Sequence, residues 1–200
     1  LNFYHQSIFS KTSLAISSNF NQLGRNASNY ISLSNTNEKL FIENANLKAF
    51  ELIHFANESS EKNQIKTFNF QVFEARIIKN SYNLARNYLI IDKGHSDGIE
   101  VDMGVITSDG IIGIVNQVTT NFSSVISILH RDLKINAGFK KNGAYGSLSW
   151  QGNHPNKMKL NDVSTLSRVA IGDTIVTGGM SDFFPRGIPI GKVFDFKKPE

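Results

Sequence analysis

The chain contains no cysteine among its 200 residues. This absence excludes disulfide bonds, thiolate metal sites and cysteine nucleophiles. The sequence also has no run of 18 or more apolar residues, so none of its segments is expected to cross a bilayer as a helix. No signal peptide is visible.

Charge is sparse and dispersed. Charged residues make up 19% of the chain and hydrophobic residues 40%, which is typical of a globular protein. The formal net charge of +4 comes from scattered lysines. The densest pairs, Lys140-Lys141 and Lys197-Lys198, are too short to be called a patch, whereas nucleic-acid-binding surfaces cluster their positive charge, so no nucleic-acid partner is predicted. Attraction to an anionic membrane surface or cell-wall polymer remains open.

Glycine and proline are absent between Gly24 and Gly94. Because these two residue types interrupt helices, their absence permits a long helix there. We predict a loosely helical connector over residues 1–29, a coiled-coil helix over 30–57 and a polar linker over 58–69.

Leucines recur every seven residues within the predicted helix, at positions 33, 40 and 47. This spacing is typical of a coiled coil, and Asn44 then occupies an inward position where asparagine fixes register. The residues predicted to mediate self-association are Leu33, Leu40, Asn44 and Leu47. In the alternative, the helix packs on its own barrel through Leu40, Phe41, Leu47, Leu52 and Phe55.

Short β-branched runs separated by Gly, Asn and Asp follow residue 70. Such spacing predicts an all-β fold, and the lack of alternation with helices argues against a parallel sheet. The fold class is therefore mainly β with an N-terminal α-helix: one small β-barrel over residues 70–130 and a second over 131–200, truncated at its C-terminal end. The predicted strands are Val72–Ile78, Tyr88–Asp92, Gly104–Thr107, Ile111–Val118, Val125–Leu129, Ile135–Phe139, Tyr145–Trp150, Met158–Leu160, Thr174–Thr177 and Ile188–Phe196.

The string His130-Arg131-Asp132 spells the start of a protein-kinase catalytic loop. That loop needs an asparagine five residues after the aspartate, where this chain has Ala137. A glycine-rich phosphate loop followed by a strand lysine is also missing, so the kinase interpretation fails.

A serine hydrolase is the other enzyme class to weigh, because β-barrels carry Ser–His–Asp triads. His95, His130 and His154 lie in the β region, but no serine sits in a Gly-x-Ser-x-Gly elbow. No two histidines have the i, i+4 spacing of a metal site. We therefore predict no catalytic, cofactor-binding or metal-binding residues.

Two adjacent aromatic residues precede a Pro-Arg-Gly turn at Phe183 to Gly187. Both rings cannot point inward if this segment is extended, so one could be an exposed anchor. The predicted partner-binding residues are Phe183, Phe184 and Arg186. In the alternative, the rings cap one end of a barrel.

Motifs along the β region resemble those of the MreC family of rod shape-determining proteins, in the form found in Bacteroidetes-type bacteria. They cover about residues 70–194, and the helix residues Glu43, Asn44 and Leu47 are similar to the family's coiled coil. The motifs are Asp92-Lys93-Gly94, Asp97-Gly98-Ile99, Asp102-Met103-Gly104-Val105, Gly110 to Val115, Ser127 to His130, Gly146 to Trp150, Gly172 to Thr177 with Gly179, and Phe184 to Gly191.

The resemblance implies a homodimeric scaffold of the cell-elongation machinery that organises peptidoglycan synthases and has no catalytic triad. Its implied partners are MreB, MreD and penicillin-binding protein 2. It implies a location on the periplasmic side of the inner membrane, a transmembrane helix before Leu1 and further barrel strands after Glu200. Two alternatives stay open: a β-barrel serine hydrolase, and a cell-wall polymer binding module using an exposed Trp150.

Overall fold

The computed structural model describes residues 33, 35–53 and 71–197. The predicted connector over 1–29 and the predicted linker over 58–69 lie outside these residues. The chain divides into two compact units, Leu1–Asn46 and Leu47–Glu200.

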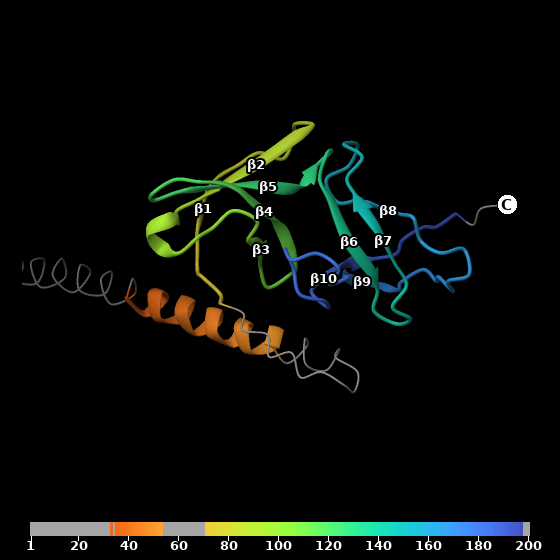
Figure 1. The fold of residues 1–200 in the computed structure, drawn as a ribbon, viewed down its shortest axis with the longest axis horizontal. Coiled ribbons are helices and arrows are strands. Elements are labelled where there is room, and N and C mark those ends of the chain that lie inside the picture. Colours follow the sequence, from red (N-terminus) through yellow and green to blue (C-terminus); the bar gives the residue numbers. More distant parts are fainter. Residues whose placement is uncertain (1–32, 34, 54–70, 198–200) are drawn as a thin grey trace, which may run out of the picture. The chain divides into compact units, whose positions relative to one another are not determined.

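A helix covers residues 35–53, with Leu33 also helical (Figure 1). It contains no glycine or proline and is rich in residues that favour helices. Leu33, Leu40 and Leu47 are between 49% and 61% exposed along it. Leu52, in its last turn, is instead buried in a core cluster of the second unit.

Two five-stranded sheets of antiparallel strands follow, with one 3-10 helix, η1 (His95–Asp97), in the loop after β2 (Figure 1). The first sheet has the order β1-β2-β5-β4-β3 and the second has the order β10-β9-β6-β7-β8. Each sheet is contiguous in sequence, and residues 131–133 join β5 to β6. The strands are β1 (Ile77–Asn80), β2 (Arg86–Ile91), β3 (Gly104–Ile106), β4 (Ile111–Val118), β5 (Ser123–His130), β6 (Lys134–Phe139), β7 (Tyr145–Ser149), β8 (Lys159–Asn161), β9 (Thr174–Thr177) and β10 (Pro189–Lys192).

The predicted fold class, mainly β with an N-terminal helix, is confirmed. The runs predicted for β4 and β9 match their strands residue for residue. The first predicted run began at Val72, but β1 begins only at Ile77. Val72 and Phe73 pack against the cores instead of pairing with a strand.

The β region has two apolar clusters. One lies within the first sheet and its loops and includes Leu89, Val115 and Val125. The other is shared by both sheets: Ile111 and Ile114 of β4 pack in it together with residues of the second sheet. The second-sheet residues of this shared cluster include Ile135, Ala137, Phe139, Leu148 and Ile175. The two sheets are therefore held together by a common core.

Strand β4 contributes to both clusters because it is irregular. Val105 pairs with Gly113 but Ile106 pairs with Ile111, so Ile112 is an extra residue on β4. Such a bulge changes which face of the sheet the following side chains occupy. Ile111 and Ile114 thus reach the shared cluster, while Ile112 packs against the cluster of the first sheet.

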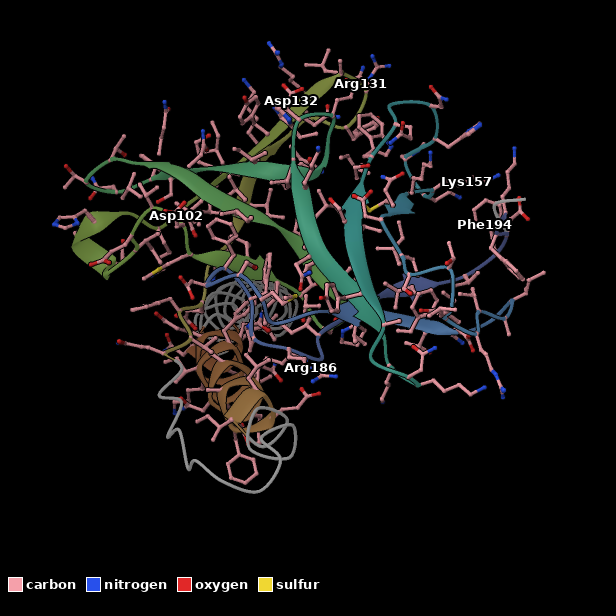
Figure 2. The ribbon with its side chains drawn as sticks, turned by 45° about the vertical axis from the view of Figure 1, so that its right-hand side comes forward. Asp102, Arg131, Asp132, Lys157, Arg186 and Phe194 are labelled. Carbon is pink, nitrogen blue, oxygen red and sulfur yellow. The ribbon has the colours of Figure 1, made fainter. Side chains whose placement is uncertain are left out.

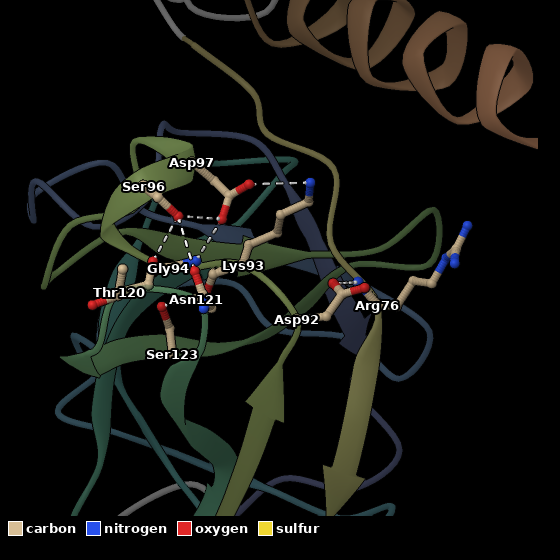
Figure 3. A network of polar contacts seen from close by, with 9 residues as sticks. All are labelled: Arg76, Asp92, Lys93, Gly94, Ser96, Asp97, Thr120, Asn121 and Ser123. Atoms are coloured by element: carbon tan, nitrogen blue, oxygen red, sulfur yellow. Dashed lines mark hydrogen bonds and ion pairs between the residues drawn. The ribbon is translucent and has the colours of Figure 1, made fainter.

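A polar network fixes the loop after β2 against the hairpin loop between β4 and β5 (Figure 3). Asp97 accepts a hydrogen bond from the Gly94 backbone N–H at 3.0 Å and contacts Lys93 Nζ at 3.3 Å. These bonds lower the pKa of the Asp97 carboxyl, and the hydrogen bond from the Gly94 N–H has the largest effect. Ser96 Oγ donates to the Thr120 carbonyl at 2.7 Å, and Ser123 Oγ donates to the Lys93 carbonyl at 2.7 Å. The loop is thereby attached to both ends of the hairpin connection.

Candidate interaction surfaces

The hydrogen bonds of the His130 ring involve a tyrosine and a backbone amide, not a serine hydroxyl. His130 lies at the end of β5, where its Nε2 contacts the Tyr88 hydroxyl at 3.2 Å. Its Nδ1 accepts a hydrogen bond from the Asp132 backbone N–H, also at 3.2 Å. In the described part of the chain, no hydrogen bond joins a serine hydroxyl to a histidine ring.

Among the same described residues, no group of three or more His, Cys, Asp or Glu side chains comes together in a way that could hold a metal ion. None of the described helices combines the length and apolar character needed to cross a membrane.

Trp150 is buried, which corrects the expectation of an exposed tryptophan. Its side chain is only 4% exposed, and its indole N–H donates to the His154 carbonyl at 2.8 Å. Polymer-binding modules that stack sugars need an accessible aromatic face. Trp150 therefore cannot serve such a module from its position after β7.

The described helix presents the leucines predicted to self-associate. Leu33, Leu40 and Leu47 are exposed, as is Asn44. Residues seven positions apart lie on one side of a helix, so the three leucines form an apolar stripe. Self-association through this stripe stays a prediction.

The segment Phe183 to Gly187 connects β9 to β10. Phe184 is buried in the shared cluster and Phe183 packs against it, whereas Arg186 is exposed. The packing of both rings on the core, Phe184 fully and Phe183 partly buried, favours the alternative in which they close one end of it. Of the three predicted residues only Arg186 is exposed, and its role toward a partner stays a prediction.

Thr177, in β9, forms hydrogen bonds with both ends of the Pro185–Ile188 turn. Its hydroxyl donates to the Pro185 carbonyl and accepts a 3.0 Å hydrogen bond from the Ile188 N–H. Its backbone N–H and carbonyl pair with Ile188 and Gly187. Because Thr177 is almost completely buried, these bonds fix where Arg186 emerges.

The segment also contacts the first sheet, at Gly104 of β3. A Cβ atom at this glycine would overlap the Phe183 carbonyl oxygen and the Phe184 ring. The absence of a side chain at position 104 is what lets Phe184 reach the core. The sequence signal for this contact was the glycine itself, in a strand otherwise made of Val and Ile.

The fold brings two arginines to the turn that contains Lys140 and Lys141. The pair Lys140-Lys141 was too short to be called a patch, but Arg168 and Arg186 lie on segments that contact the same turn. No sequence pattern could have shown this, because the arginines are far from the lysines along the chain.

Comparison with known proteins places this architecture in a family. The family model described as "Rod shape-determining protein MreC, barrel core" matches residues 77–200. The cell shape-determining protein MreC of Listeria monocytogenes is 28% identical over 128 residues, which cover 62% of this chain and 43% of that protein. The chain spans less than half the length of the curated relatives it matches.

Solved structures agree. The crystal structure of MreC from Pseudomonas aeruginosa superposes with a TM-score of 0.59 at 26% identity, covering 63% of this chain and 81% of that one. The major periplasmic domain from the cell shape-determining filament MreC superposes with a TM-score of 0.53, also at 26% identity, covering 62% of this chain and 80% of that one. Through its two-sheet β region, the chain belongs to the MreC family of rod shape-determining proteins.

Proposed function

We propose that this protein is a non-catalytic scaffold of the cell-elongation machinery, which maintains rod shape by dimerising and organising peptidoglycan synthases. Membership of the MreC family supports the role in cell shape. The contacts of His130 with Tyr88 and the Asp132 backbone support the absence of a hydrolase triad.

The proposed location is the periplasmic side of the inner membrane, with a single-pass anchor in the full-length protein. A related chain of similar fold is described as a major periplasmic domain, which supports this location. The proposed partners are a second copy of the chain, penicillin-binding protein 2, MreD and MreB. They follow from the family.

The observation that carries the scaffold role is the exposed leucine stripe on the helix. Leu33, Leu40 and Leu47 leave large apolar side chains in water, although burying a leucine is favourable by roughly 1.5–3 kcal/mol. A parallel partner helix would cover all three and place Asn44 against its counterpart. The stripe therefore supports a homodimer.

Sedimentation velocity over a range of concentrations tests this proposal. We expect the chain to sediment as a dimer and the double variant Leu40→Asp with Leu47→Asp to sediment as a monomer, because four carboxylates would then face one another in the interface.

The matched control is Asn35→Asp with Asn46→Asp. It adds the same charge at exposed helix positions outside the stripe, so it should remain dimeric. A chain that is monomeric at every concentration, or a leucine variant that still dimerises, would contradict dimerisation through this helix.

A further inference from the structure

Three loops bring four exposed basic residues to the β6–β7 turn of the second sheet. Lys140 and Lys141 lie in this turn and are exposed. The Arg168 carbonyl accepts a hydrogen bond from the Asn142 side chain at 3.1 Å, which brings the β8–β9 loop to the turn. We call Lys140, Lys141, Arg168 and Arg186 the basic cluster.

Arg186 joins the basic cluster from the β9–β10 connection. A Cβ atom at Gly143 would lie 3.3 Å from its guanidinium group. Figure 2 shows Arg186 below the strands of the β region, and Figure 1 shows the β6–β7 turn at the lower end of the second sheet. Three loops thus present four cations at one end of a sheet.

Carboxylates do not neutralise the basic cluster. None of its four side chains forms an ion pair with a described Asp or Glu. The nearby loops contain Asp173 and Asp182, and Asp173 accepts a 2.8 Å hydrogen bond from the Ala170 N–H of its own loop. The four positive charges therefore face solvent and attract anions.

Charge is also divided between the two sheets. Residues 71–130 contain four Lys or Arg and six Asp or Glu, a net charge of −2. Residues 131–197 contain ten Lys or Arg and five Asp or Glu, a net charge of +5. The second sheet and its loops, which include the basic cluster, therefore bear the positive charge of the β region.

Large aliphatic side chains stand on the same loops. Leu166, two residues before Arg168, is 92% exposed. Ile171, further along that loop, is also largely exposed. So is Met180, which follows Gly179, a glycine packed against Arg186. Exposed aliphatic side chains next to cations suit the interfacial region of a bilayer, where apolar groups enter below the charged headgroups.

We propose that this end of the second sheet binds the surface of a bilayer rich in anionic phospholipid. The basic cluster would contact headgroup phosphates, each Lys or Arg contributing on the order of fivefold in affinity. Leu166, Ile171 and Met180 would enter the boundary between headgroups and acyl chains. An anionic polymer would satisfy the cations alone, so the exposed aliphatic residues favour the lipid surface.

Vesicle co-sedimentation of the whole chain tests this surface. We expect binding to vesicles of equal parts phosphatidylglycerol and phosphatidylcholine, and at least tenfold weaker binding to phosphatidylcholine alone. Lys140→Gln with Lys141→Gln should weaken binding to the anionic vesicles by about tenfold or more. Leu166→Ser should weaken it by a few-fold while leaving its salt dependence unchanged.

The matched control removes two lysines from the opposite end of the same sheet, by Lys134→Gln with Lys159→Gln. Both residues are paired with Ser149, far from the β6–β7 turn. Equal losses in the two double variants would overturn the proposal, since net charge alone would then explain binding. Retention on isolated peptidoglycan without vesicle binding would overturn it in favour of a wall polymer. These outcomes do not depend on the proposed dimer.

Discussion

At the scale of single residues, the neutral His130 ring is held in one tautomer by its neighbours. A backbone N–H can only donate, so the bond from Asp132 N–H makes Nδ1 an acceptor and puts the ring proton on Nε2, facing Tyr88. The Tyr88 and His130 rings meet edge to face at 5.2 Å. A second ring proton would oppose the Asp132 N–H.

The environment of His130 predicts a pH-dependent stability. Burial lowers the pKa of this imidazole from 6.5; Asp132 raises it and Arg86 lowers it further. The unfolded chain therefore binds the proton at a higher pH than the folded chain does. The stability contribution is fully present above about pH 6.5 and is lost as pH falls toward the lowered pKa.

Urea unfolding at about pH 7.5 and about pH 5 checks this prediction. We expect the wild-type chain to lose more unfolding free energy between these values than His130→Gln, which keeps a donor and an acceptor but gains no proton. Equal losses in the two proteins would show that His130 does not contribute to the pH dependence.

At the scale of elements, strand β3 and the β9–β10 connection fit together only because residue 104 lacks a side chain. A methyl group at Gly104 would overlap atoms of Phe183 and Phe184, and Phe184 is buried. Overpacking of this kind forces neighbours to shift. The contact between the two sheets is therefore sensitive to this position.

The variant Gly104→Ala is expected to lower the free energy of unfolding by about 1–3 kcal/mol. Gly191→Ala in β10 is the control: no atom lies within 4 Å of its Cβ position, so its effect should stay within about 0.5 kcal/mol. Urea unfolding of both variants measures the difference. If Gly104→Ala were as stable as Gly191→Ala, this result would contradict the close packing of Phe184 against β3.

Strands were predictable where the chain alternates β-branched residues with turn residues. Ile111–Val118 lies between Gly110 and a polar hairpin loop, so its bounds could be read directly. The start of β1 could not, because Val72 and Phe73 are apolar for packing and not for pairing. The expectation of an exposed Trp150 was wrong, since a tryptophan before a polar loop is equally compatible with burial. The basic cluster was missed because its loops meet only in the fold, through the Asn142–Arg168 hydrogen bond and the approach of Arg186 to Gly143.

At the scale of the whole molecule, the shared cluster makes the two sheets depend on each other. Ile114 of the first sheet and Ile135 of the second are both 4% exposed within it. Separating the sheets would expose these side chains to water. Residues 47–200 form one compact unit, so we expect the β region to unfold in one cooperative transition.

Trp150 is the only tryptophan and lies beside the second sheet, so its fluorescence reports on that sheet alone. We expect its transition to coincide with the loss of β circular dichroism. Ile114→Ala, in the first sheet, should lower stability by about 2–5 kcal/mol and shift the Trp150 transition equally. Ile78→Ala, at an exposed position of β1, should change neither the stability nor the midpoint of the Trp150 transition. Separate midpoints for the two signals would refute cooperativity.

Each sheet is built from one uninterrupted stretch of chain, and this sets an order for folding during synthesis. Once residue 130 has emerged, the first sheet can complete its strand pairing and its own apolar cluster. Ile111 and Ile114 then still lack the partners that β6 to β9 supply. An uncovered apolar face on a newly made sheet is prone to aggregation. The nascent chain is therefore most prone to aggregation while residues 134–177 are being added.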